Sequence, residues 1–425
     1  MTTGSDALQT SDLILISCDD HLIEPPSVFD NRLPAKYRDR APKLEPGPSG
    51  VERWVFEGIV IGSVGLNAVA GWPKEEWSLD PVGMAEMRPG CYDVHQRVRD
   101  MDAAGILMSM CFPTMGGFNG RAFTSATDRD LTGAVISAYN DWHIDEWCGA
   151  YPGRFIALGV LPLWDVTACI AELRRLAARG VRAVTFPETP YAIGLPSFQS
   201  GHWDPLLKVA SELGVVLCLH IGLGIRLIEQ APDSSIDNFI VIAGQVSAIA
   251  AADLVLGPTL RRFPDLRIAL SEGGIGWIPF FLDRADRHHT NQVWTGARDM
   301  RLPSEVFKSG SILACFITDP SGLKLRDQVG VDNIAWECDY PHSDSNWPNA
   351  AELVHAELRE AGASDEETHK ITWKNSARFF GIDPFAVIPR GQATVGALRA
   401  TATDVETGEV SRRVWRERFE AVDAS

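Results

Sequence analysis

Eight short apolar runs, separated by longer amphipathic segments, limit what this 425-residue chain can fold into more than any other feature. Short apolar runs bounded by glycine or proline are typical of buried strands. The expected strands are Leu13–Cys18, Ile106–Phe112, Phe155–Val160, Val181–Phe186, Val215–His220, Leu266–Ser271, Ile312–Ile317 and Ile334–Cys338.

Helical patterns lie between these strands and after the last one. The expected helices include Val94–Ala104, Leu131–Trp147, Val166–Arg179, Pro205–Leu213, Ile236–Leu256, Ile278–His289, Ala350–Glu360 and Asp365–Phe380. Eight β/α units predict an α/β protein with a closed (β/α)8 TIM barrel, in which the active site lies at the carboxyl ends of the strands. An open doubly wound sheet is the alternative, but no glycine-rich phosphate loop follows the first strand.

Two segments fall outside a simple barrel, which we place in residues 1–382. Residues 25–93 are too long for an ordinary crossover, so we expect an insertion or lid, with a hairpin within Trp54–Val64 that turns at Glu57–Gly58. Residues 383–425 are polar with isolated apolar positions such as Trp415, and we expect a C-terminal extension there. It would be either an arm onto a partner subunit or a frayed end.

The charge balance excludes several partner classes. The formal net charge is -17 and there is no Lys/Arg run, so we expect no binding to nucleic acid or to anionic membranes. The first dozen residues are polar, and no apolar stretch reaches about 18 residues, so we expect a cytoplasmic protein. None of the 8 cysteines forms a CxxC pair, which favours buried thiols over disulfides or a cysteine-zinc site.

Titratable side chains gather where four of the expected strands end. In an extended strand Asp19 and His21 point the same way, and the carboxyl ends of barrel strands surround one mouth. Buried carboxylates are costly unless they are paired or bind metal, so the cluster predicts a metal site. The candidate ligands are Asp19, His21, Glu24, His220, Glu272, Asp339 and His342, of which Glu272, Asp339 and His342 are also the candidate catalytic residues.

The ligand types favour iron or manganese. Oxygen-rich ligation with a few imidazoles suits these ions better than a zinc site of histidine and thiolate does, although zinc is an alternative. Four carboxylates and three histidines suffice for two ions. With a single ion, Glu24, Glu272 and His342 would instead support the ligands through hydrogen bonds.

Three further residues are candidates for substrate contact. Arg121 ends the glycine-rich segment Met115–Arg121, His202 precedes the helix that starts near Pro205, and Trp277 follows a glycine-rich turn. Each also has an ordinary structural explanation, namely a surface loop, a loop residue before a helix cap, and helix packing.

Several motifs together resemble the amidohydrolase-related (amidohydrolase 2) family. They are the Asp19-x-His21 start, the His220 strand, the run Ser271–Trp277 and the run Trp336–Asp344. The resemblance covers about residues 12–382 and implies a metal-dependent TIM barrel with Asp19, His21, His220 and Asp339 as ligands. The family includes aminocarboxymuconate-semialdehyde decarboxylase, aromatic acid decarboxylases and hydrolases, and it suggests a dimer.

The sequence also departs from familiar members of that family. The decarboxylase branch has a histidine at the end of the sixth strand, where this chain has Glu272, and Val181–Pro187 lacks the bridging lysine of binuclear hydrolases. The carboxylate-rich set is similar to the branch that carries dinuclear iron or iron-manganese centres and hydroxylates substrates with dioxygen.

Three functions therefore stay open. The main expectation is a monooxygenase with two Fe or Mn ions that hydroxylates a small organic substrate. The alternative is a Zn- or Mn-dependent hydrolase or non-oxidative decarboxylase of a small carboxylic acid or amide. The third is a non-catalytic partner subunit, so the assembly would be a homodimer or a heterodimer.

Overall fold

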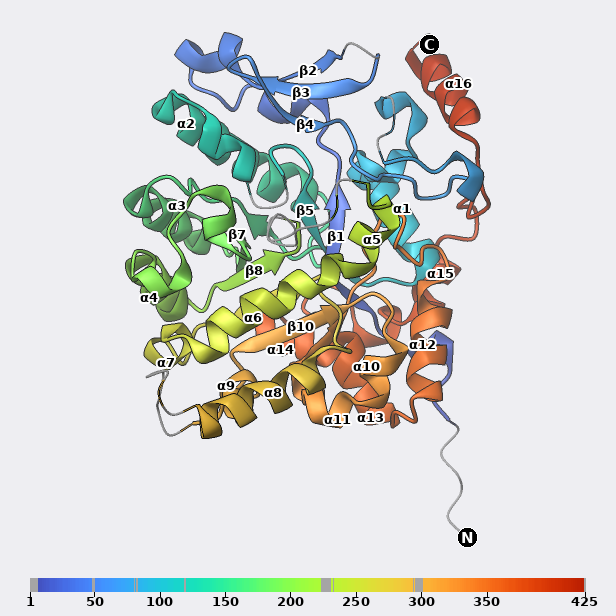
Figure 1. Ribbon diagram of the computed structural model, residues 1–425. Helices are drawn as coiled ribbons and strands as arrows, with labels where there is room; N and C mark the ends of the chain where they lie inside the picture. Colours follow the sequence, from blue (N-terminus) through green and yellow to red (C-terminus); the bar gives the residue numbers. More distant parts are fainter. Residues whose placement is uncertain are drawn as a thin grey trace.

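Eight parallel strands form the centre of the molecule in the computed structural model, which describes residues 7–47, 50–79, 81, 83–117, 120–222, 231, 233–292, 294 and 301–423 (Figure 1). The strands are β1 (Ile16–Leu22), β5 (Met108–Pro113), β6 (Leu158–Gly159), β7 (Ala183–Pro187), β8 (Val216–His220), β9 (Ile268–Ser271), β10 (Ile312–Phe316) and β11 (Ile334–Trp336). All eight overlap the predicted runs, but β1 continues through the acidic residues that were expected to follow it.

Two seams close these strands into a barrel. Strands β6 to β11 pair in sequence order as one sheet, and β1 pairs with β5. A bridge between Ser109 and Phe155 joins β5 to the segment before β6. On the other side, the Asp339 N–H donates to the Asp19 carbonyl at 2.8 Å and the His21 N–H donates to the Tyr340 carbonyl at 2.7 Å. The predicted TIM barrel is confirmed.

The barrel interior is packed with side chains rather than open. One apolar cluster takes at least one member from every barrel strand: Ile16, Cys18, Met108, Met110, Phe112, Leu158, Ala183, Val216, Cys218, Ala269, Leu313, Cys315 and Ala335. A larger cluster lies between the strands and the surrounding helices. All 8 cysteines are free thiols, and seven of them are buried, as the sequence predicts.

Helices surround the barrel, and every predicted helix has a counterpart. They are α1 (Val94–Ala104), α2 (Arg129–Trp142), α3 (Val166–Ala178), α4 (Asp204–Leu213), α5 (Ile236–Ile242), α6 (Val246–Leu256), α7 (Thr259–Arg262), α8 (Ile278–Asn291), α9 (Pro303–Phe307), α10 (Pro320–Lys324), α11 (Arg326–Val329), α12 (Ala350–Glu360), α13 (Asp365–His369) and α14 (Asn375–Phe380). A π-helical turn at Lys370–Lys374 connects α13 and α14.

One helical segment, Ile236–Leu256, is long and apolar enough by composition to cross a membrane. It comprises α5 and α6, and α6 buries Val246, Ala250, Leu254 and Val255 within the protein. Burial accounts for the apolar residues of α6 that pack inward, whereas α5 has no buried residue and exposes Ile236, Ile240 and Val241.

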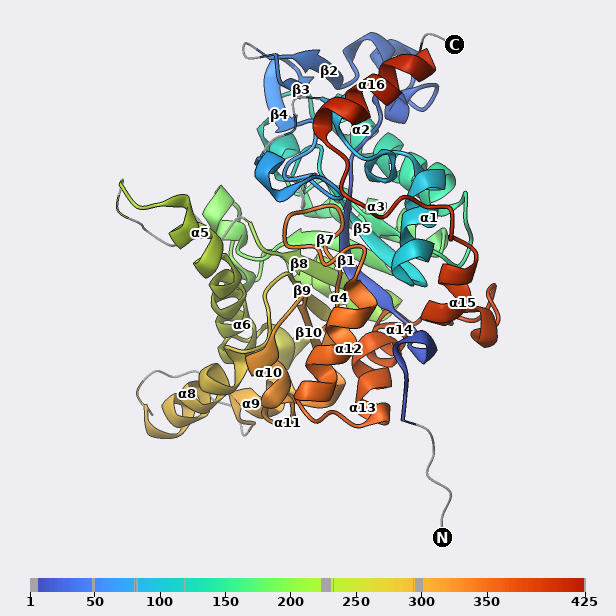
Figure 2. The same ribbon diagram turned by 90° about the vertical axis from the view of Figure 1, so that its right-hand side faces the viewer.

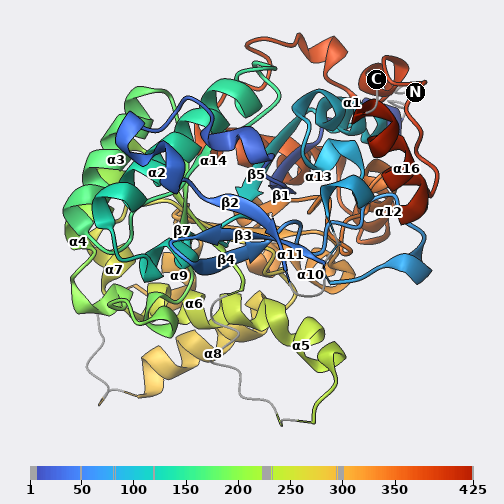
Figure 3. The same cartoon turned by 90° about the horizontal axis from the view of Figure 1, so that it is seen from above.

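The insertion after β1 covers the mouth of the barrel. It contains an antiparallel sheet of β2 (Lys43–Pro46), β3 (Glu52–Phe56) and β4 (Ile59–Ser63), which lies above the barrel strands in Figures 1 and 3. The predicted hairpin is confirmed, with Glu57 and Gly58 both at positive φ (49° and 76°). Farther along the insertion, the N–H groups of Val69 and Ala70 both donate to the Pro341 carbonyl at 3.0 Å.

The C-terminal extension packs on its own chain instead of fraying. It includes α15 (Val395–Ala400) and α16 (Arg412–Asp423), and α16 lies beside the insertion (Figure 2). Arg412 and Arg416 both bind the carboxylate of Glu86, and the Trp415 side chain is buried. The extension therefore packs on the outer side of the insertion and is held there by ion pairs.

Candidate metal centre

A β-bulge in β1 sets the direction of the first two candidate ligands. Ser17 pairs with Ser109 on β5 while Asp20 pairs with Cys111, so β1 has one extra residue between these pairs. Before the bulge, Ile16 and Cys18 belong to the inward cluster. The extra residue changes the alternation, so that Asp19 and His21 point inward and Asp20 points outward.

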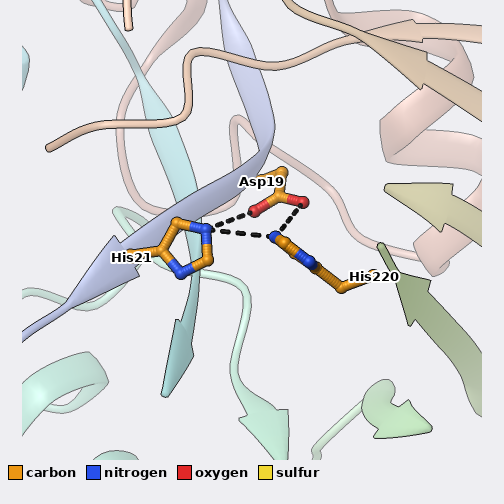
Figure 4. Close-up of side chains that lie close together, drawn as sticks. All are labelled: Asp19, His21 and His220. Carbon is orange, nitrogen blue, oxygen red and sulfur yellow. Dashed lines mark hydrogen bonds and ion pairs between the residues drawn. The ribbon is translucent and has the colours of Figure 1, made fainter. Parts of the chain in front are cut away.

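Four side chains from three strand ends meet at the mouth. The Nε2 atom of His21 lies 3.5 Å from Asp19 Oδ1, 3.3 Å from Asp339 Oδ1 and 3.1 Å from His220 Nε2. His220 Nε2 lies 3.4 Å from Asp19 Oδ2. Figure 4 shows Asp19 and His21 on β1 facing His220 on β8. These four residues are the ligands that the family resemblance implies.

The structure offers a second donor group that shares one residue with the first. Asp19, His21 and His220 form one set of potential ligands within reach of a single ion, and His21, Asp339 and His342 form another. The His342 ring stacks on the His21 ring at 3.8 Å between centroids, and its Nδ1 lies 2.9 Å from Asp339 Oδ1.

Glu272 extends the first set from the end of β9. Its Oε2 lies 3.3 Å from His220 Nε2, and its side chain is 18% exposed, whereas the Asp19 and His220 side chains are fully buried. Glu272 and Asp339 both have positive φ, at 58° and 59°. Non-glycine residues rarely adopt this conformation, which occurs in turns and is enriched at functional sites.

The buried acids of this site face imidazole nitrogens instead of lysine or arginine. Both oxygens of Asp19 and both oxygens of Asp339 are buried and accept no hydrogen bond within the described structure. Burial raises the pKa of Asp19 well above its usual value, and the neighbouring charges of Glu337, Asp339 and Glu272 raise it further. Burial likewise raises the pKa of Asp339. A bound cation would offset both costs.

The imidazoles are suited to the same cation. Burial lowers the pKa of His220 to about 3, so its ring is neutral at pH 7. Its Nδ1 lies 2.6 Å from the Ile221 carbonyl oxygen, which identifies Nδ1 as the protonated nitrogen. Nε2 is then unprotonated, and its lone pair is available to a metal ion. Burial also lowers the pKa of His342, to about 4. This donor set fits a divalent metal ion.

Glu24, predicted as a ligand, occupies a different environment. Its Oε1 accepts a hydrogen bond from the Thr114 N–H at 3.1 Å, and its Oε2 accepts one from the Met115 N–H at 2.8 Å. Burial raises its pKa to about 8. Neither ligand set found among the described residues contains Glu24. Its observed contacts are with the loop after β5.

The three candidate substrate residues lie in different places. Arg121 lines a pocket between β4 and the loop after β5, of which residues 118 and 119 lie outside the described part. His202 is exposed beside Trp203, at 4.7 Å between ring centroids. The Trp277 indole donates to the Gly273 carbonyl at 2.9 Å, so Trp277 holds the turn that follows Glu272.

Sequence reasoning missed the residues that support this site. Glu337 is fully buried, and its Oε1 accepts the Glu272 N–H at 3.0 Å. Asp20 accepts the Tyr340 N–H at 3.0 Å and the Ser109 hydroxyl, and thereby ties β1 to the loop after β11. Glu337 could have been noticed from the sequence, because it is an acid two residues before Asp339 at the end of the last strand. Asp20 could not, because its partners are distant in sequence.

Comparisons with known proteins agree with the barrel fold. A curated relative, the 2-amino-3-carboxymuconate-6-semialdehyde decarboxylase of Dictyostelium discoideum, is 22% identical over 327 residues, which is 73% of this chain and 83% of the relative. The solved structure of amidohydrolase map2389c from Mycobacterium avium subsp. paratuberculosis K-10 has a TM-score of 0.69 at 21% identity, and the match covers 87% of this chain and 99% of that chain.

A second solved structure was determined with a metal ion bound. It is the dihydroxybenzoic acid decarboxylase from Polaromonas sp. JS666 with manganese and the inhibitor 2-nitroresorcinol, with a TM-score of 0.55 at 20% identity over 73% of this chain and 90% of that chain. The amidohydrolase family model itself matches residues 29–382. Since that match covers most of the sequence, the chain belongs to the amidohydrolase family and is an enzyme of that family.

Proposed function

We propose that this protein is a divalent-metal-dependent, non-oxidative decarboxylase of a small carboxylic acid. The observation that carries the proposal is the buried set of Asp19, His21, His220 and Asp339, in which four carboxylate oxygens have no hydrogen-bond partner in the described structure. The decarboxylase names of two relatives supply the reaction class. Manganese is the proposed ion, because one of those relatives was solved with it.

The four ligands would hold the ion, which would supply positive charge that binds and polarises the substrate. Glu272 is suited to the proton transfer. Burial raises the pKa of the Glu272 carboxyl group well above its usual value, which favours the protonated form that a general acid needs. It is also partly exposed, whereas Asp19 and His220 beside it are not.

The proposed reaction needs one proton at carbon. The bond between the substrate carbon and its carboxylate breaks, CO2 leaves, and the electron pair remaining on carbon takes the Glu272 proton. Solvent then restores the proton on Glu272. Glu272 would serve in place of the histidine that the family resemblance leads one to expect at the end of β9.

The test is CO2 release under strict exclusion of oxygen. Purified protein loaded with Mn²⁺ is incubated with a panel of hydroxybenzoic and unsaturated carboxylic acids, with and without a chelator. We expect metal-dependent CO2 release at the same rate with and without air, and loss of at least about 100-fold in Glu272→Gln, in line with removal of a general acid. A reaction that stops without dioxygen would overturn the proposal.

Dioxygen-dependent hydroxylation is the second candidate. The second donor group of His21, Asp339 and His342, with Glu272 beside the first group, favours it because together they offer enough ligands for two ions. The comparisons lend this function no support. Elemental analysis separates the two candidates, since two Fe or Mn ions per chain with substrate-dependent oxygen uptake would favour hydroxylation.

A further inference from the structure

Glu337 is a buried acid at the metal centre with no assigned role. It follows β11 directly, its side chain is completely buried, and its Oε2 has no hydrogen-bond partner in the described structure. No lysine or arginine among the described residues forms a salt bridge with it. A carboxyl group in such a place is costly to the fold, so a purely structural role does not account for it.

Within the described structure, the hydrogen bond of the Glu337 side chain goes to the backbone of Glu272. Its Oε1 accepts the Glu272 N–H at 3.0 Å. Glu272 has a φ of 58°, which costs free energy for a residue with a side chain and persists only where the surroundings enforce it. Glu337 thus supplies a contact that holds Glu272 in this conformation.

That conformation determines where the Glu272 carboxylate lies. Its Oε2 is 3.3 Å from Nε2 of His220, one of the four proposed ligands, so the position of Glu272 bears on how His220 would meet the ion. The far side of the same turn is held by other groups: Asp319 accepts the N–H groups of Ile275 and Gly276 at 2.7 and 2.6 Å. Glu337 therefore acts at the one end of the turn that faces the metal centre.

Asp339 provides an internal comparison. It also has positive φ, at 59°, but its N–H donates to the backbone carbonyl of Asp19. A backbone carbonyl is present whatever the sequence, whereas the acceptor for Glu272 depends on the side chain at position 337. Burial, and after it the negative charge of Glu337, raises the pKa of Asp19 above its usual value.

We propose that Glu337 is a positioning residue of the metal centre, which fixes Glu272 against His220 through the Glu272 backbone N–H. The role rests on the metal centre of the proposed function but not on the reaction performed there. Metal binding therefore tests it whether the enzyme proves to be a decarboxylase or a hydroxylase.

The experiment measures Mn²⁺ affinity by competition with a chelator, in the full-length protein. Glu337→Leu removes the acceptor, and we expect a loss of about 10–100-fold, the usual effect of removing a group that orients a ligand. Glu337→Gln keeps an acceptor oxygen and should retain nearly the wild-type affinity. The visible spectrum of bound Co²⁺ should change in the leucine variant and stay unchanged in the glutamine variant.

A double-mutant cycle shows whether Glu337 acts through Glu272. In a Glu272→Ala background, Glu337→Leu should cause little further loss of Mn²⁺ affinity, because the carboxylate that it positions is gone. An equal loss in both backgrounds, or wild-type affinity in Glu337→Leu, would overturn the proposal. So would a glutamine variant as weak as the leucine variant.

Two controls separate loss of metal binding from loss of folding. If Glu337→Leu does not fold, Glu337→Met replaces it in the same cycle. Glu172→Leu removes a buried glutamate on α3 that binds Arg175 and Asn140, and it should lower the melting temperature without changing Mn²⁺ affinity. Failure of the wild-type protein to bind any divalent ion would refute the proposed function instead.

Discussion

Two regions of this molecule bury acids, and they treat them in opposite ways. Beneath the insertion, Asp100 accepts two hydrogen bonds from Arg88, at 2.8 and 2.7 Å, and a third from the Tyr340 hydroxyl at 2.7 Å. At the barrel mouth, Asp19 and Asp339 are buried beside imidazoles, and no lysine or arginine of the described structure forms an ion pair with them. The chain provides its own cation where an acid serves the fold, and omits it where an acid is available to a ligand.

Removing the cation of the first region should have the largest effect. Arg88→Met leaves Asp100 buried without its charge partner, so we expect the free energy of unfolding to fall by about 3–5 kcal/mol. Urea denaturation measures it. The double variant Arg88→Met/Asp100→Asn should recover part of the loss, and Arg413→Met, which breaks an exposed ion pair with Glu417, should change little. An unchanged free energy of unfolding in Arg88→Met would contradict the claim that the acid beneath the insertion depends on its own cation.

Removing an acid from the second region should act on metal binding instead of stability. Asp339→Asn deletes one ligand charge, and we expect Mn²⁺ affinity to fall by at least about 100-fold, or about 2.7 kcal/mol. The metal-free protein should be no less stable, because the variant removes a buried carboxylate that no lysine or arginine of the described structure neutralises. His202→Ala, at an exposed histidine, is the control that should bind Mn²⁺ normally. Parallel loss of stability and affinity would contradict the comparison.

Acid should weaken metal binding by a smaller and graded amount. Burial raises the pKa of Asp19 and Asp339, so protons compete with the ion for these oxygens as the pH falls. Affinity should therefore rise with pH, by about tenfold per pH unit for each proton displaced. Chelator competition at several pH values measures the slope, and a flat profile would show that the acids are already ionised without the metal.

The sequence predicted the barrel well because the signal for each strand is local. Each inward and outward face contributes apolar residues, so runs such as Val215–His220 are recognisable without knowledge of their partners. The limits of β1 were less predictable. The strand continues through Asp19 and His21 because of the bulge and of hydrogen bonds to Tyr340, and none of these is visible in a local pattern.

The site residues, like the strands, were predictable where the signal is local and not where it depends on distant contacts. His220 and Asp339 stand at strand ends, where the topology alone brings them together. Glu24 was expected to join them, but its carboxylate meets the amides of Thr114 and Met115, about 90 residues away in sequence. Glu337 was not predicted as part of the site, because its role depends on the positive φ of Glu272, which only the folded chain specifies.

The hydrogen bonds between β1 and the loop after β11 have a consequence for the order of events during synthesis. Asp19 and His21 leave the ribosome more than 300 residues before Asp339 and Tyr340. Only then do the His21 and Asp339 amides find their acceptors across the seam. While the intervening residues are made, the nascent chain therefore holds only part of the ligand set, and the segment that completes this set also supplies the last hydrogen bonds of the barrel.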